Sequence, residues 1–174
     1  MATLQKNPVE TAQQAEQKFI EVLRSFDYAM LVSSGAGAEP HARPMAIAES
    51  DTDGTIWFLT GKDTQKVFEI AEHTETLAVM QSSSRYLSVT GRARIVDDRA
   101  RIHKLWKEPM RVWFDGKDDP NIVLIRLEPR FAEYWDNKGF SGVRLALRFA
   151  KAYVTGDSPK QNPDDVATHA KVQL

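Results

Sequence analysis

The sequence HARPMAIAESDTDGTIWFLTGKDTQK, residues 41–66, contains two extended segments followed by the start of a helix. Residues 41–48 and 55–60 have the apolar and β-branched content of strands. The segment 51–54 between them ends in an Asp-Gly pair, which suits the positive backbone angles of a tight turn. We therefore expect an antiparallel hairpin of these two strands, followed by a helix over residues 64–72.

Polar side chains of these segments are expected to meet where the predicted helix begins. Arg43 lies on the first strand, Thr60 ends the second, and Thr64 and Lys66 lie in the first helical turn. The N-terminus of a helix also offers backbone N–H groups that attract anions. Together these groups predict a phosphate site. Both cations have a simpler alternative role: Arg43 could pair with a surface acid, and Lys66 could be a solvated helix lysine.

Composition is typical of one globular domain, since the chain has 174 residues of which 42% are apolar. The net charge of −1 gives no general attraction to nucleic acid or anionic lipid, and neither is expected as a partner. The chain has no cysteine, and its histidines lack metal-ligand spacing, so no metal site is expected. Since no apolar run approaches ~20 residues and no signal-peptide core is evident, we expect a cytoplasmic protein without membrane contact.

The rest of the chain alternates short strands with short helices. Helices are expected over residues 7–26, 97–106 and 143–154, and strands over residues 28–33, 76–82, 86–96, 122–127 and 131–135. The last two are either separate strands or one bulged strand, because Pro129 lies between them. Residues 157–174 are polar and are expected to be disordered. This pattern favours a mainly β fold, a small antiparallel barrel with flanking helices.

The order of several motifs resembles the FMN-binding split-barrel superfamily of pyridoxamine 5′-phosphate oxidase-like proteins, and within it the bacterial general stress protein 26 branch. The motifs are Ala-Arg-Pro-Met-Ala at 42–46, Trp-Phe-Leu-Thr-Gly-Lys-x-x-x-Lys at 57–66, Tyr-Leu-Ser-Val-Thr-Gly-Arg-Ala at 86–93 and Glu-Tyr-Trp-Asp at 133–136. The resemblance implies an antiparallel split β-barrel. It also implies one flavin-binding domain over residues 1–156, with N-terminal and C-terminal helices.

The resemblance further implies a homodimer that holds FMN, or FAD, at the subunit interface. The family's phosphate contacts correspond to the two cations and two threonines of the predicted phosphate site. Its contacts with the flavin ring correspond to neighbouring strand residues. Trp113 is expected to cover the ring from the other subunit. The full expected set is Arg43, Pro44, Met45, Ala46, Phe58, Leu59, Thr60, Lys62, Thr64, Gln65, Lys66, Tyr86, Ser88 and Trp113. No catalytic residue is identified.

The implied function is that of a stress-related flavoprotein, an oxidoreductase acting on an unidentified small molecule, because a bound flavin supplies electron chemistry. One alternative is a non-catalytic flavin carrier or redox sensor, and a further one is a pyridoxal or pyridoxamine phosphate binder. Vitamin B6 oxidation is disfavoured. The chain has Thr-Gln-Lys at 64–66 where such oxidases have a Ser-Arg-Lys pattern, and it lacks their basic C-terminal motif.

Overall fold

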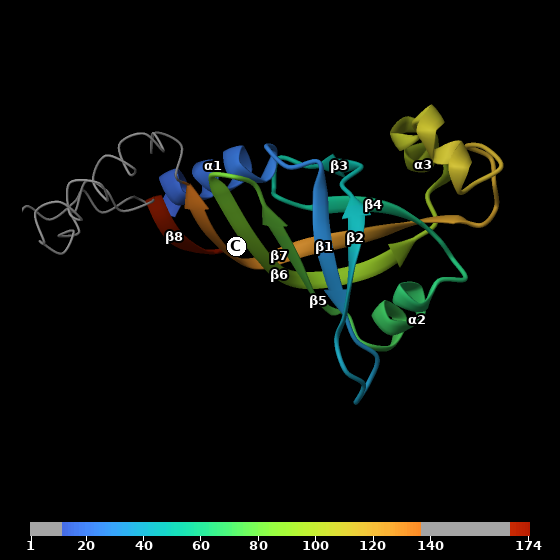
Figure 1. Ribbon diagram of the computed structural model, residues 1–174, viewed down its shortest axis with the longest axis horizontal. Helices are drawn as coiled ribbons and strands as arrows, with labels where there is room; N and C mark the ends of the chain where they lie inside the picture. The colour runs from blue at the N-terminus through green and yellow to red at the C-terminus, as the bar shows by residue number, and fades with distance from the viewer. Residues whose placement is uncertain (1–11, 137–167) are drawn as a thin grey trace, which may run out of the picture.

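Eight strands form one curled antiparallel sheet in the computed structural model of this chain, which describes residues 12–136 and 168–174 (Figure 1). The strand order is β2-β1-β5-β6-β7-β4-β3, and β8 pairs with β7. The helices are α1 (Ala12–Leu23), α2 (Gln65–Glu72), α3 (Arg99–Leu105) and the 3-10 helix η1 (Glu108–Val112). The strands are β1 (Tyr28–Ser33), β2 (His41–Ala46), β3 (Glu49–Ser50), β4 (Ile56–Gly61), β5 (Glu75–Gln81), β6 (Arg85–Val96), β7 (Ile122–Asp136) and β8 (Thr168–Gln173). The predicted mainly β split barrel is confirmed.

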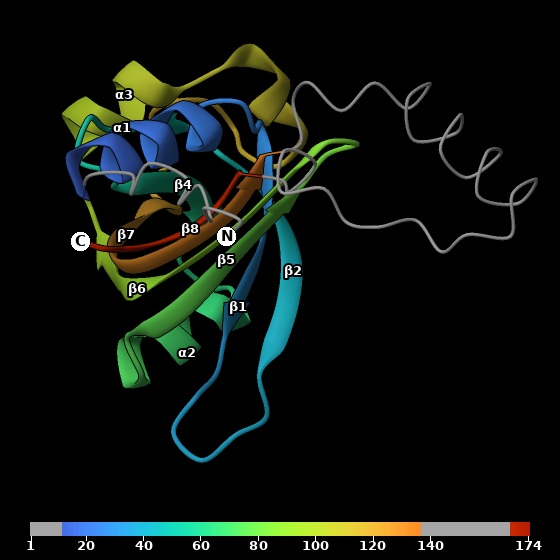
Figure 2. The same ribbon diagram turned by 90° about the vertical axis from the view of Figure 1, so that its left-hand side faces the viewer.

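Alternation along the strands determines which face of the sheet is buried. On β6, Leu87, Val89 and Ala93 are buried while Tyr86 and Arg92 are exposed, as the sequence predicts. The buried face packs against α1, which lies over β6, β7 and β8 (Figure 2). The apolar side chains of α1 that enter this core are Ala15, Phe19, Val22 and Leu23.

β7 runs through Pro129 as one bulged strand. Its pairing with β6 shifts between Thr90 and Gly91, which face residues two apart on β7, so Arg130 is the extra residue. A bulge interrupts the hydrogen-bond ladder and therefore tolerates a proline. A Cβ on Gly91 would lie 2.0 Å from the carbonyl oxygen of Glu128, and only glycine fits there. The first half of β7 pairs with β4 and the second half with β8.

The predicted hairpin of residues 41–48 with 55–60 is wrong in its pairing. β2 pairs with β1 along its whole length, and the turn at 51–54 instead joins β4 to the short strand β3. The local turn chemistry is the same in both arrangements, but the longer ladder with β1 satisfies more backbone groups. As a result, β2 and the β3–β4 pair lie at opposite ends of the strand order and face each other across the split of the barrel (Figure 1).

Strand β8 corrects the prediction of a disordered tail over residues 157–174. Residues Thr168–Gln173 pair with the second half of β7, and Val172 is buried in the core. This pairing is non-local, and the polar composition of the segment does not reveal it. The predicted helix over 143–154 and the predicted start of the first helix lie outside the described residues, and α1 ends three residues before its predicted end at Phe26. In the described part of the chain, no helix has the length and apolar character needed to span a membrane.

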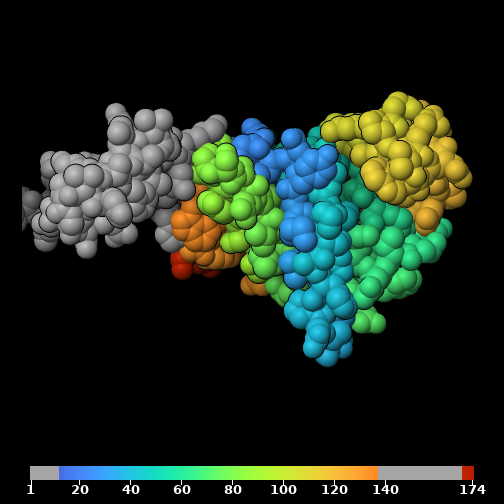
Figure 3. Space-filling model, viewed as in Figure 1, coloured from blue at the N-terminus to red at the C-terminus, as the bar shows by residue number. Residues whose placement is uncertain are grey.

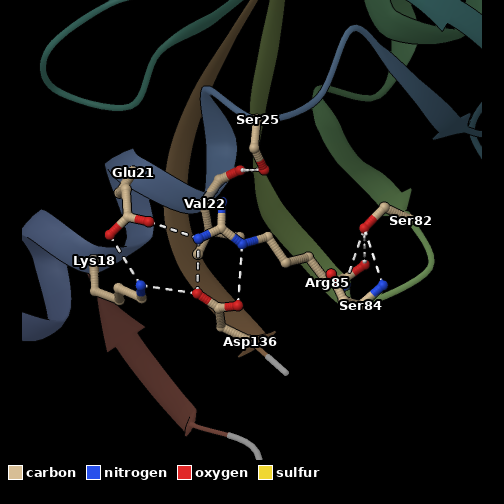
Figure 4. Close-up of polar contacts among 8 residues, drawn as sticks. All are labelled: Lys18, Glu21, Val22, Ser25, Ser82, Ser84, Arg85 and Asp136. Carbon is tan, nitrogen blue, oxygen red and sulfur yellow. Dashed lines mark hydrogen bonds and ion pairs between the residues drawn. The ribbon is translucent and has the colours of Figure 1, made fainter. Parts of the chain in front are cut away.

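A buried ion network ties α1 to the ends of β6 and β7 (Figure 4). Arg85 donates two hydrogen bonds to the Asp136 carboxylate, from Nε at 3.0 Å and from Nη2 at 2.8 Å. Arg85 Nη2 also donates to Glu21 Oε1 at 2.6 Å, and Lys18 Nζ lies 2.8 Å from Asp136 Oδ2. The side chains of Arg85 and Asp136 are each only 4% exposed, whereas those of Lys18 and Glu21 on α1 are 27% and 56% exposed, so the helix is joined to a buried pair through partly exposed side chains.

Candidate anion-binding site

The split between β2 and β4 brings together the four side chains of the predicted phosphate site, which we call the cradle: Arg43, Thr60, Thr64 and Lys66. Thr60 lies near the end of β4, Thr64 is the N-cap of α2, and Lys66 lies in its first turn. Lys66 Nζ donates to Thr60 Oγ1 at 3.0 Å, and the hydroxyl oxygens of Thr60 and Thr64 are 3.4 Å apart. Arg43, on β2, lies close enough for its charge to act on Lys66.

Lys66 is a cation in a partly desolvated position. Burial, and then the positive charge of Arg43, lower the pKa of Lys66 below its ordinary value of 10.5, and Glu69 opposes them. A lowered lysine pKa means that the protonated form is disfavoured by its surroundings. An anion bound beside Arg43 and Lys66 would therefore be attracted by both cations and would stabilise both.

The start of α2 adds backbone donors to the cradle. Thr64 has the extended backbone of an N-cap residue, but its side chain makes no capping hydrogen bond and donates to the Gly61 carbonyl at 2.8 Å instead. The Val67 N–H donates to the Thr64 carbonyl at 2.9 Å, and the N–H groups of the two residues before it precede any helical acceptor four residues back; such groups bind anions. Cations, hydroxyls and N–H groups in this arrangement form a donor set that fits a phosphate group.

A buried carboxylate that the sequence analysis missed lies beside Arg43. Glu69 Oε2 accepts hydrogen bonds from Arg43 Nη2 at 2.8 Å and from Ser33 Oγ at 2.7 Å. Its Oε1 lies 2.7 Å from His41 Nδ1. Burial raises the pKa of Glu69, but the hydrogen bonds from Ser33, His41 and Arg43 outweigh burial and hold the pKa below its ordinary value of 4.5. Glu69 is therefore ionised at neutral pH.

The helical spacing of α2 contains the signal for Glu69. Residues three and four apart on a helix share a face, so Lys66, Glu69 and the buried Ile70 lie together. A glutamate on the same face as a buried isoleucine needs a partner inside the protein. The sequence could therefore have predicted a buried acid on α2, although not that Arg43 and Ser33 would meet it.

The other expected residues on β2 and β4 differ in how far their side chains are buried. On β2, Met45 packs against the core, while Pro44 and Ala46 lie on the exposed side. On β4, Phe58 is fully buried, so its side chain belongs to the core and only its backbone remains a candidate contact. Leu59 is half-buried and packs against a second cluster around Trp57.

Gln65 and Lys62 flank the cradle at the start of α2. Gln65 Nε2 lies 3.3 Å from His41 Nδ1, but that nitrogen donates to Glu69 and cannot also accept from Gln65, so Gln65 only borders the Glu69 network. Lys62 is exposed, its backbone N–H donates to the Asn121 carbonyl at 2.8 Å, and its charge acts on Asp119. Lys62 therefore faces the loop before β7, and it is not connected to the cradle by any hydrogen bond or ion pair within the described residues.

Tyr86, Ser88 and Trp113 are not brought to the cradle within one chain. β6 is separated from β2 by β1 and β5, so Tyr86 and Ser88 lie about three strand spacings, roughly 14 Å, from β2. Trp113 follows η1 and is 74% exposed, in the lobe that α3 and η1 form at one end of the molecule (Figure 3).

An exposed apolar surface extends over β1, β5 and β6. Tyr28 and Met30 alternate on the outer face of β1 and are 68% and 42% exposed. Met30 lies opposite Val79 of β5, and Tyr86 lies on the same face of β6. β1 and β2 lie at the surface of the face seen in Figure 3. Exposed apolar side chains that gather on one face are typical of an interaction surface.

The curled antiparallel sheet defines a split-barrel protein with a candidate anion site at the split. The chain belongs to the pyridoxamine 5′-phosphate oxidase-like family, whose model matches residues 14–160. It is similar to general stress protein 26 of Bacillus subtilis (strain 168), with 32% identity over 123 residues that cover 67% of this chain and 85% of the relative. The resemblance predicted from the motifs is confirmed.

Solved structures agree with this assignment. A candidate general stress protein 26 from Jannaschia sp. CCS1 is 25% identical with a TM-score of 0.69, covering 93% of this chain and 99% of that one. The general stress FMN/FAD binding protein from Xanthomonas citri is 32% identical with a TM-score of 0.60, covering 72% of this chain and 90% of that one. The same fold therefore extends over most of each chain.

Proposed function

We propose that this protein binds FMN, or FAD, with the phosphate of the flavin nucleotide in the cradle. The observation that carries the proposal is the meeting of Arg43, Thr60, Thr64 and Lys66 at the first turn of α2. The relative from Xanthomonas citri, named as an FMN/FAD binding protein, supports a flavin as the ligand. A phosphate gains most from charge-assisted hydrogen bonds, and two cations and two hydroxyls can supply them.

The second part of the proposal is a homodimer with the flavin at the subunit interface. The exposed apolar surface around Tyr28, Met30 and Val79 suits a second copy of the chain. Tyr86, Ser88 and Trp113 lie on elements other than those that carry the cradle, and a partner subunit would bring its own copies of them to the interface. In this arrangement Arg43 and Lys66 hold the phosphate, and the partner's Trp113 excludes water from the ring.

The bound flavin supplies electron-transfer chemistry, and we propose an oxidoreductase acting on an unidentified small molecule. The residues of this chain bind and orient the cofactor. The Pro44–Ala46 segment and the backbone at Phe58–Leu59 border the ring. The second candidate is a non-catalytic flavin carrier or redox sensor, which needs the same binding residues and no acid or base.

The phosphate assignment is tested by comparing FMN with riboflavin, which has the same ring and no phosphate. Each charge-assisted hydrogen bond contributes ~1.5–3 kcal/mol, so the double variant Arg43→Ala/Lys66→Ala should lose about 100-fold or more in FMN affinity. Its riboflavin affinity should stay within about threefold of wild type. Lys104→Ala removes an exposed lysine that pairs with Glu49 and serves as the matched control. Equal losses for both ligands would refute the cradle.

The two candidate functions are separated by reduction of the flavin complex with NADH or NADPH. Loss of the flavin absorbance followed by repeated turnover in air supports the oxidoreductase. Reduction without turnover by any reductant supports the carrier or sensor. Competition by pyridoxal phosphate, measured as displacement of FMN, tests the remaining alternative, since its phosphate suits the same cradle.

A further inference from the structure

Glu69 is an ionised carboxylate inside the protein, and its position is costly without partners. Its side chain is 7% exposed, and both oxygens are engaged: Oε2 by Arg43 and Ser33, and Oε1 by His41. These partners come from β1 and β2, whereas Glu69 lies on α2. The carboxylate therefore connects the helix that forms one side of the cradle to the strand that carries Arg43.

The hydrogen bonds around Arg43 fix the plane of its guanidinium group. Nη1 donates to Ser33 Oγ at 2.6 Å and Nη2 donates to Glu69 Oε2 at 2.8 Å, and Ser33 Oγ in turn donates to the same Glu69 oxygen at 2.7 Å. The three groups close a ring of hydrogen bonds. Two fixed terminal nitrogens remove most of the rotational freedom of the side chain, so a ligand that binds the remaining N–H groups need not order it.

Glu69 also lies three residues after Lys66 on α2, so its charge acts on Lys66 while its direct ion pair is with Arg43. Arg43 and Lys66 repel each other, and the charge of Glu69 opposes this effect on Lys66. Without an acid at this position, the two cations would tend to separate before a ligand arrives. A buried negative charge thus keeps two positive charges close together.

We propose that Glu69 is the positioning residue of the phosphate site: it fixes the Arg43 guanidinium through the Ser33 ring and holds Arg43 and Lys66 together, without itself contacting the ligand. This inference rests on the proposed function of the cradle. It assigns part of the preference for phosphate to an acidic residue, in addition to the cations and hydroxyls of the cradle. It also explains why an acid lies within a site for an anion.

The test measures dissociation constants for FMN and riboflavin in Glu69→Ala, Glu69→Gln and Glu72→Ala. Glu69→Ala should lower the preference for FMN over riboflavin by about tenfold or more, because Arg43 is released. Glu69→Gln keeps an acceptor for Arg43 and Ser33 but loses the charge that opposes the repulsion between Arg43 and Lys66, so its preference for FMN should fall by less than that of Glu69→Ala. Glu72→Ala is the matched control, because Glu72 lies on the same helix and accepts from the Ala36 N–H at 3.3 Å instead of from Arg43.

A purely structural role for Glu69 would weaken both ligands together and leave their ratio unchanged, which would overturn the proposal. In an Arg43→Ala background, the proposal also requires that Glu69→Ala cause no further loss of phosphate preference. If Glu69→Ala does not fold, Ser33→Ala decides: the preference should fall by about threefold or more, and an unchanged preference would overturn the proposal. A wild-type protein with no preference for FMN would instead contradict the proposed function.

Discussion

Replacement of Arg85 by Met should destabilise the protein strongly, because it removes one partner from a buried ion pair. The side chains of Arg85 and Asp136 are each 4% exposed and share two hydrogen bonds of 3.0 and 2.8 Å. Methionine keeps most of the side-chain volume and removes only the charge and the donors. Breaking a buried pair from one side costs ~3–5 kcal/mol, and we expect about 3 because Lys18 still contacts Asp136.

The measurement is the free energy of unfolding, or the thermal midpoint, at one fixed protein concentration, since a dimer would make both depend on concentration. A loss of about 3 kcal/mol corresponds to a decrease of roughly 6–12 °C for a chain of this size. Arg92→Met is the matched control, because Arg92 lies on the same strand and pairs with Glu75 at the surface, at 3.2 Å. Exposed pairs contribute at most about 1 kcal/mol. Equal losses in the two variants would refute the assignment of the network as a structural element.

Three further predictions concern the site and the sheet. Burial and the charge of Arg43 lower the pKa of Lys66, and a bound phosphate favours its protonated form. The preference for FMN over riboflavin should therefore fall as the pH rises toward 10.5, the ordinary pKa of lysine, and this fall should be absent in Lys66→Ala. Trp113→Ala should change flavin fluorescence while the size-exclusion profile stays that of a dimer, and an unchanged spectrum would remove Trp113 from the site. Gly91→Ala would bring a Cβ to 2.0 Å from the Glu128 carbonyl oxygen and should cost about 3 kcal/mol in chemical unfolding.

Local patterns in the sequence predicted most individual elements correctly. β1 spans Tyr28–Ser33, as predicted, because its apolar run lies between clear turn residues. α2 begins after Thr64 for the same kind of reason, since the N-cap preference of a threonine depends only on its neighbours. The alternation on β6 likewise identified its buried face. These features depend on contacts between residues close together in the sequence, so they can be predicted without knowledge of the tertiary structure.

The pairing between strands was harder to predict from the sequence, because the free N–H and C=O groups at the edge of a strand can hydrogen-bond with any strand that reaches them. The Asp-Gly turn at 51–54 was recognised, but its partner strand was not: β2 pairs with β1, and β4 pairs with β3 and β7. β8 escaped prediction because its short, polar sequence becomes a strand only against the second half of β7. The cradle residues were predicted from their positions on two strands and a helix start, whereas their distances depend on how the barrel closes.

The amino-acid sequence by itself determined the class of fold, the helix start at Thr64 and the residue types of the phosphate site, because periodicity, capping and charge are properties of short segments. The tertiary structure alone decided that β2 and β4 border the split, and that the carboxylate of Glu69 is enclosed by Arg43, Ser33 and His41. The reason is that a buried charge is stable only where partners from other elements enclose it, and those partners lie 26 to 36 residues away along the chain.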